Sequence, residues 1–181
     1  MKEIIERILE KLNTLEKEDF YTEYESNNKK YNYITDFIKT LFGQEGEKLG
    51  YESAAHENRF AYKDFEYNER EWMFDFVWYK MSDTNDQVML SVPLVLESEL
   101  SNKSFGGLKV DFDKLLVASD SDKVFVTSYD YRNEEELKKK EEYIQKAINN
   151  YNSFKADETL YLIIWDENDT GKFYFKEFKK Q

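Results

Sequence analysis

The stretch "VMLSVPLVLESEL", residues 88–100, ends an apolar run with two glutamates. Side chains alternate between the two faces of a strand, so Glu97 and Glu99 share one face. Neighbouring carboxylates repel each other unless a cation or solvent compensates their charge. Glu97 directly follows the apolar residues 94–96, where a charged side chain is costly without a partner. The stretch therefore predicts a buried strand whose end carries acidic side chains that a cation or solvent must compensate.

A second strand is predicted in "EWMFDFVWY", residues 71–79, which the polar loop 81–87 separates from the first. Asp75 lies on the face opposite to its two phenylalanine neighbours. Strands joined by such a loop form a meander, and their pairing would place Asp75 near Glu97. Asp75, Glu97 and Glu99 are therefore predicted to converge on one side of the sheet. Carboxylate clusters of this kind suit Mg²⁺ or Mn²⁺.

The remaining elements follow a regular order along the chain. Apolar residues at helical spacing predict two N-terminal helices, over residues 1–12 and 33–41, joined by the polar stretch 24–32. The elements predicted around and after the two strands are a strand at 59–67, a short helix at 111–119, a strand at 123–129, a long helix at 133–151 and a hairpin at 159–178. The order predicts one α/β domain over residues 1–181, with a mixed central sheet and helices in three layers.

Composition excludes several classes of site. The chain has no cysteine, which removes disulfides, thiolate nucleophiles and cysteine-ligated zinc. His56 is the one histidine, so no multi-histidine metal site is expected, and we interpret it as an ordinary surface or loop residue. No apolar run approaches a membrane span, and we expect a cytoplasmic protein. The net charge of −12 counts against simple binding to a phosphate backbone.

The acidic residues and the elements around them resemble the PD-(D/E)xK nuclease superfamily, which has the restriction-endonuclease-like fold. The resemblance lies in "FD" at 74–75, "LESE" at 96–99, the helix "DFDKLL" at 111–116 and the strand that follows it. It covers residues 30–130 in element order. It implies that Asp75 and Glu97 hold a divalent metal ion for phosphodiester hydrolysis.

The sequence departs from the superfamily pattern at two places. The third motif position, usually lysine, is Glu99, as in members with an ExE motif, and Phe74 replaces the usual proline. Lys114, in the helix after the motif strand, is the nearest candidate to supply the missing positive charge, since some families of this fold use a relocated lysine. The resemblance therefore implies metal ligation by Asp75, Glu97 and Glu99, with Glu99 or Lys114 positioning the attacking water.

Each site residue also has a purely structural interpretation. Asp75 and Glu99 can face solvent at strand ends, and Lys114 can pair with Asp111 or Asp113 on its own helix. Two functions follow from the alternatives. One is a Mg²⁺- or Mn²⁺-dependent endonuclease acting on DNA or RNA. The other is a non-catalytic, immunity-type module whose acidic surface binds a basic protein partner.

Overall fold

The computed structural model describes residues 1–14, 27–55, 73–101, 105–129, 134–167 and 170–181. In these residues it has four helices and six strands, which hydrogen-bond in the order β1-β2-β3-β4-β5-β6. The helices are α1 (Lys2–Leu12), α3 (Asn27–Lys48), α4 (Phe105–Val117) and α5 (Glu134–Asn150). The strands are β1 (Glu52–Ala55), β2 (Phe76–Met81), β3 (Met89–Glu99), β4 (Asp122–Tyr129), β5 (Leu160–Asp166) and β6 (Phe173–Phe178). The protein is therefore α/β with a mixed sheet, as the sequence predicts.

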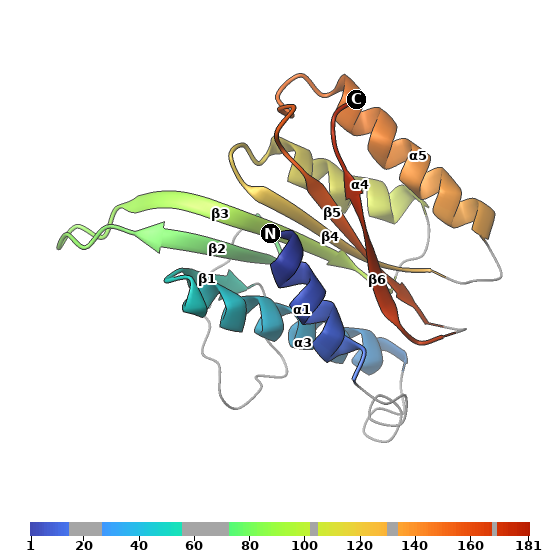
Figure 1. The fold of residues 1–181 in the computed structure, drawn as a ribbon, viewed down its shortest axis with the longest axis horizontal. Helices are drawn as coiled ribbons and strands as arrows, with labels where there is room; N and C mark the ends of the chain where they lie inside the picture. The colour runs from blue at the N-terminus through green and yellow to red at the C-terminus, as the bar shows by residue number, and fades with distance from the viewer. Residues whose placement is uncertain (15–26, 56–72, 102–104, 130–133, 168–169) are drawn as a thin grey trace. The chain divides into compact units, whose positions relative to one another are not determined.

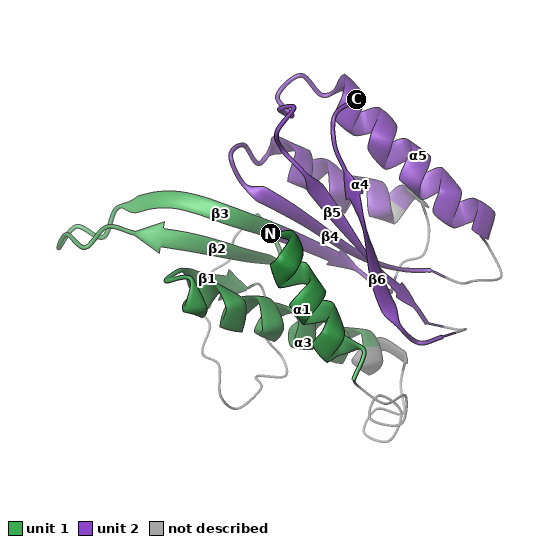
Figure 2. Ribbon diagram, in the orientation of Figure 1, with its two compact units in different colours: residues 1–95 green, residues 96–181 purple. Residues whose placement is uncertain are grey.

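The chain divides into two compact units, residues 1–95 and 96–181 (Figure 2). The boundary falls within β3, which begins in unit 1 and ends in unit 2. Each unit has helices packed on its own strands, α3 on β1 and β2 in unit 1 and α4 on β4 in unit 2 (Figure 1). The arrangement of both sets of helices in three layers stays a prediction.

Unit 1 is built on the aromatic face of β2. Phe76 and Trp78 alternate inward, and both rings pack against Phe42 of α3. The indole Nε1 of Trp78 donates a hydrogen bond of 2.9 Å to the Phe42 carbonyl. Trp78 reaches the helix because Gly46 has no side chain, as an ideal Cβ there would lie 2.5 Å from Nε1. The predicted apolar face of this strand is therefore confirmed.

A buried carboxylate joins the two helices of unit 1. Glu45 on α3 is 2 % exposed, and Arg7 of α1 donates two hydrogen bonds of 3.1 and 2.7 Å to its Oε2. Lys48, one turn further along α3, donates a bond of 2.6 Å to Oε1. Burial alone would raise the pKa of Glu45, but the hydrogen bonds and charges of Lys48 and Arg7 lower it below its ordinary value. Glu45 is therefore held as a carboxylate.

The strands of unit 1 agree with the prediction in part. The predicted strand at 59–67 lies outside the described residues, and β1 at Glu52–Ala55 was not foreseen because four residues give too short a pattern. β1 pairs antiparallel with β2. The segment 82–88 closes through a bond of 2.8 Å from the Ser82 amide to the Val88 carbonyl. A connection this short makes β2 and β3 antiparallel neighbours, as predicted.

Unit 2 consists of a crossover and a hairpin. β4 and β5 are parallel, with α5 in the connection between them, and β5 and β6 are antiparallel. Phe112 of α4 contacts both Phe125 of β4 and Tyr143 of α5, so the two helices pack side by side on this part of the sheet (Figure 1). The predicted strand 123–129, the long helix and the closing hairpin are confirmed.

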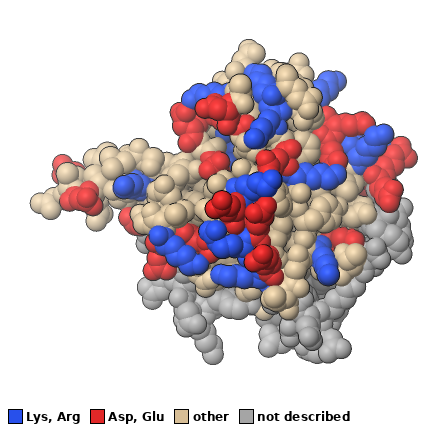
Figure 3. Space-filling model, in the orientation of Figure 1, with Lys and Arg blue, Asp and Glu red and all other residues tan. Residues whose placement is uncertain are grey.

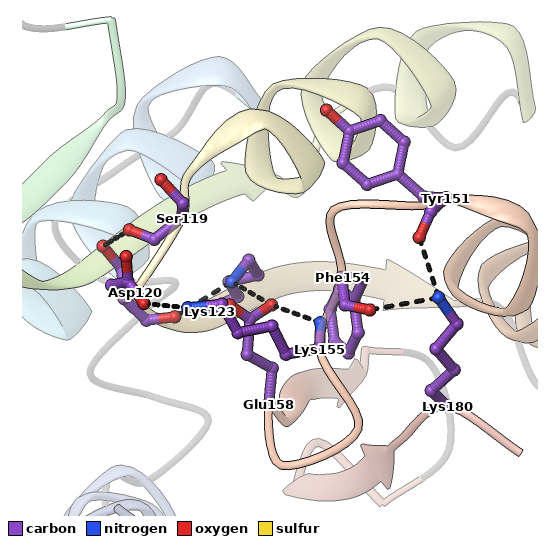
Figure 4. A network of polar contacts seen from close by, with 9 residues as sticks. Ser119, Asp120, Lys123, Tyr151, Phe154, Lys155, Glu158 and Lys180 are labelled. Carbon is purple, nitrogen blue, oxygen red and sulfur yellow. Dashed lines mark hydrogen bonds and ion pairs between the residues drawn. The ribbon is translucent and has the colours of Figure 1, made fainter.

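A buried ion pair joins the start of β4 to the loop before β5 (Figure 4). The Lys123 side chain is 0 % exposed, and its Nζ lies 3.0 Å from Glu158 Oε2 and 5.1 Å from the centre of the Phe154 ring. Lys180 closes the other end of the loop by donating to the carbonyls of Tyr151 and Phe154. These contacts fix the segment that follows α5.

Helix boundaries and lysine burial differ from the sequence-based expectations. α3 begins at Asn27, within the stretch 24–32 that was predicted to link two helices, and α4 begins at Phe105, six residues before the predicted start. On α5, Glu135 and Lys139 form an i,i+4 ion pair at 2.9 Å. Lys140 of the same helix is 2 % exposed, although lysine is usually found at the surface. Among the described helices, none has the length and apolar character that a bilayer span requires.

Candidate functional site

Glu97 lies at the buried end of β3. Its side chain is 1 % exposed, and it directly follows three apolar residues of which none is more than 1 % exposed. The strand end is fixed from β4, where the buried Ser128 hydroxyl donates a bond of 2.7 Å to the Leu100 carbonyl. The sequence-based expectation of a buried acid at the end of an apolar strand is confirmed.

Lys114 of α4 reaches this buried glutamate. Its Nζ lies 3.4 Å from Glu97 Oε2 and 2.9 Å from Asp111 Oδ1, and its side chain is 36 % exposed. Burial alone would lower the pKa of Lys114, but the hydrogen bond to Asp111 and the charge of Glu97 raise it above its ordinary value. The lysine is therefore a fixed positive charge between two carboxylates. The structural interpretation, a pair with Asp111 on the same helix, is confirmed, and the catalytic role of Lys114 stays a prediction.

Asp111 was not predicted as a site residue in its own right. It lies one turn before Lys114 on α4, and its carboxylate is the nearer of the two acids to the ammonium. The i,i+3 spacing of the two residues was visible in the sequence as a helix-surface pair. Their packing beside Glu97 was not, because it depends on how α4 lies on the sheet.

Glu99 lies at the last position of β3 and is partly exposed. Its Oε1 accepts a hydrogen bond of 3.0 Å from the hydroxyl of Ser101. Since side chains alternate along the strand, Glu99 shares the sheet face of Glu97, as expected. Its proposed roles as a metal ligand and as a water-positioning group stay predictions.

Asp75 directly precedes β2 and is partly buried. The predicted strand 71–79 therefore begins later, at Phe76. Asp75 belongs to unit 1 and Glu97 to unit 2, so the convergence of these two carboxylates stays a prediction. Among the described residues, no group of three or more histidine, cysteine, aspartate or glutamate side chains is arranged to hold a metal ion.

The helix that carries Lys114 is anchored to α5. The Tyr143 hydroxyl donates a bond of 3.0 Å to Asp113 Oδ1, and the Lys109 ammonium lies 5.8 Å from the centre of the Tyr143 ring. Burial, together with the hydrogen bond and charge of Asp113, raises the pKa of Tyr143 to about 12. Asp113 is thus occupied by tyrosine, which leaves Asp111 as the helix partner of Lys114.

Comparisons of the chain with protein-family models, with curated proteins and with solved structures found no match. The resemblance to the PD-(D/E)xK superfamily therefore stays a prediction, resting on the motif residues and on the order of the elements. His56 lies outside the described residues.

Proposed function

We propose that the protein is a divalent-metal-dependent nuclease that hydrolyses phosphodiester bonds of DNA or RNA. The proposal is carried by the ion pair between Glu97, buried at the end of β3, and Lys114 of the following helix. This pair supplies the acidic residue and the relocated lysine that the resemblance implies. The order of α3, three strands, α4 and β4 also agrees with the resemblance.

The proposed ligands are carboxylates, which suit a hard divalent cation. The carboxylates of Glu97 and Glu99 offer the oxygen ligands that Mg²⁺ and Mn²⁺ prefer, and Asp75 is proposed as a further ligand. Such an ion, when bound, lowers the pKa of a coordinated water and offsets charge that develops on the phosphate. In this proposal Glu97 binds the cation, Lys114 donates hydrogen bonds to the phosphate or the attacking water, and Glu99 positions that water.

Surface charge sets the conditions under which a substrate can bind. The chain carries a net charge of −12, and basic and acidic side chains are interspersed on the face seen in Figure 3. A polyanionic substrate would gain little from long-range attraction, and salt would weaken its binding further. Assays at low ionic strength are therefore the most sensitive.

Cleavage of labelled duplex DNA, single-stranded DNA and RNA with Mg²⁺ or Mn²⁺ tests the proposal. We expect cutting of at least one substrate, abolished by a chelator, and a loss of about 1,000-fold or more in Glu97→Ala because a metal ligand is removed. Glu45→Ala is the matched control, since it removes an equally buried carboxylate of unit 1 that has no proposed role in the reaction. Cleavage by Glu97→Ala at the wild-type rate would refute the assignment.

A second candidate function, the acidic binding module, is favoured by the hairpin between β2 and β3. Val88, Met89 and Leu90 are 56 %, 40 % and 60 % exposed there, beside the exposed acids Asp83 and Asp86. Exposed apolar side chains rimmed by charge are typical of protein-binding surfaces. If none of the three substrates is cut with either metal, this function replaces the nuclease proposal.

A further inference from the structure

The β2–β3 hairpin of unit 1 continues beyond its flanking strand as a projecting arm, residues 82–91 (Figure 1). β1 pairs with β2 only over residues 76–79, so this pairing ends before the arm begins. The Ser82 amide donates a bond of 2.8 Å to the Val88 carbonyl, and the Val88 amide donates a bond of 3.0 Å to Ser82 Oγ. The arm is therefore closed by hydrogen bonds at its base.

The arm exposes three consecutive apolar side chains. Val88, Met89 and Leu90 are 56 %, 40 % and 60 % exposed. The other large apolar side chains that are exposed in the described part of the chain are not adjacent to one another in sequence: Leu49, Met73, Val110 and Val117. Single exposed apolar residues are common at protein surfaces, whereas a contiguous group marks a binding surface. Val88 and Leu90 lie two residues apart, so an extended chain places them on the same face.

The backbone beside this apolar group adopts a costly conformation. Gln87, directly before Val88, has a φ of 45°, in the left-handed region that residues other than glycine seldom adopt. Backbone strain of this kind is concentrated at binding and active sites, where the surrounding structure maintains it. In the arm, the hydrogen bonds between Ser82 and Val88 maintain the turn, and the apolar group follows directly from it.

The charge of the arm selects the kind of partner that it can bind. Asp83 and Asp86 are exposed, and residues 82–91 contain no lysine, arginine or histidine. The chain carries a net charge of −12, so a second copy of it would be repelled. A cationic partner would be attracted, because its basic side chains would pair with the two aspartates.

We propose that the arm is a docking surface for an extended, cationic segment of a partner protein that carries apolar side chains between its lysines or arginines. Apolar side chains on every second residue of such a segment share one face, and they would cover Val88 and Leu90. The inference rests on the second candidate function and names its partner. It is separate from the nuclease proposal, because the arm belongs to unit 1 whereas Glu97 and Lys114 belong to unit 2.

Fluorescence anisotropy with three short labelled peptides of equal length tests the proposal at low ionic strength. One peptide alternates lysine with valine, one alternates lysine with serine, and one alternates glutamate with valine. We expect the lysine–valine peptide to bind at least about ten-fold more tightly than the other two, because it alone offers both the charge and the apolar side chains. Added salt should weaken its binding.

Two variants of the arm locate the contact. Leu90→Ser should weaken binding of the lysine–valine peptide about ten-fold, because the side chain no longer gains from burial. Leu49→Ser is the matched control, since Leu49 is also an exposed leucine of unit 1, at 52 %, but lies outside the arm. Asp83→Asn with Asp86→Asn should weaken binding about three-fold and reduce its dependence on salt.

Each of the other outcomes overturns the proposal in a distinct way. Equal weakening in Leu90→Ser and Leu49→Ser would place the contact outside the arm and leave the acidic binding module standing. Equal binding of the lysine–valine and lysine–serine peptides would show that charge alone acts. Binding of no peptide would remove both the docking surface and the support for the second candidate function. Self-association of the wild type in sedimentation, lost in Leu90→Ser, would identify a second copy of the chain as the occupant instead.

Discussion

Units 1 and 2 each bury a glutamate beside a helix, but they surround it with different cations. Glu45 is 2 % exposed and receives direct hydrogen bonds from Arg7 and Lys48, with Lys11 at 4.0 Å. Glu97 is 1 % exposed, and its cation Lys114 lies closer to Asp111 than to it. Glu45 thus accepts direct hydrogen bonds from two cations, whereas Glu97 shares the Lys114 ammonium with Asp111.

The difference separates a structural use of a buried charge from a proposed functional one. At Glu45, the ion pairs link α1 to α3. The cationic side chains are 45–61 % exposed, so solvent screens part of their charge. At Glu97, the ammonium is shared with Asp111, and the glutamate is a proposed metal ligand. Burial alone does not distinguish the two, since both glutamates are buried to the same extent.

The largest expected effect concerns Glu158, the partner of the fully buried Lys123. Glu158→Ala leaves Lys123, 0 % exposed, without its carboxylate, and we expect the free energy of unfolding to fall by about 3–5 kcal/mol. Glu45→Ala should cost only about 1–2 kcal/mol, because Arg7 and Lys48 are at least half exposed and become solvated. Urea unfolding at pH 7 measures both.

Lys123→Met with Glu158→Leu is the control for that comparison. Replacing both charges by apolar side chains removes the unpaired ion, so the double variant should be more stable than Glu158→Ala. Equal losses in Glu158→Ala and Glu45→Ala would contradict the distinction between cations that are buried and cations that are exposed.

A smaller effect is expected from glycines of α3 and α4, the helices that carry Glu45 and Lys114. Gly46→Ala should lower the free energy of unfolding by about 1–3 kcal/mol, because the new Cβ would overlap the Trp78 indole that packs against α3. Gly106→Ala in α4 is the control. An ideal Cβ there has no atom within 4 Å, so we expect no loss and a gain of up to about 1 kcal/mol. Gains of the same size in both would show that helix propensity, rather than contact, decides the outcome.

The smallest effect is the pH dependence contributed by Glu45. Its pKa is below the ordinary value of 4.5 in the folded chain, so its stabilisation is complete above that value and is lost as the pH falls through the folded pKa. Glu45→Gln should therefore make unfolding less dependent on pH between pH 5 and pH 2, measured by urea unfolding across that range. Glu135→Gln, at a fully exposed ion pair on α5, is the control. It should leave the pH dependence of the free energy of unfolding below pH 5 close to wild type. If the unfolding of Glu45→Gln keeps the wild-type pH dependence below pH 5, the lowered pKa of Glu45 is contradicted.

Local sequence pattern determined the elements that bury a continuous face. The apolar spacing of α1 and α5, the alternation of β2 and the acid at the end of β3 were all readable, because each pattern arises from the geometry of its own segment. Patterns failed where segments were short or mixed. Four residues of β1 give no period, and Gly106 and Gly107 in the first turn of α4 have low helix propensity.

Tertiary structure alone decided which charges meet. The sequence predicted that Glu97 would be buried and need a partner, and it gave Lys114, 17 residues further on, as a candidate positive charge. The packing of α4 on the sheet then set the distance between them and let Asp111 share the lysine. Packing likewise buried Lys123 and Lys140, although lysine is usually exposed. Periodicity reports the face on which a side chain lies, but the partner across space depends on how the elements pack.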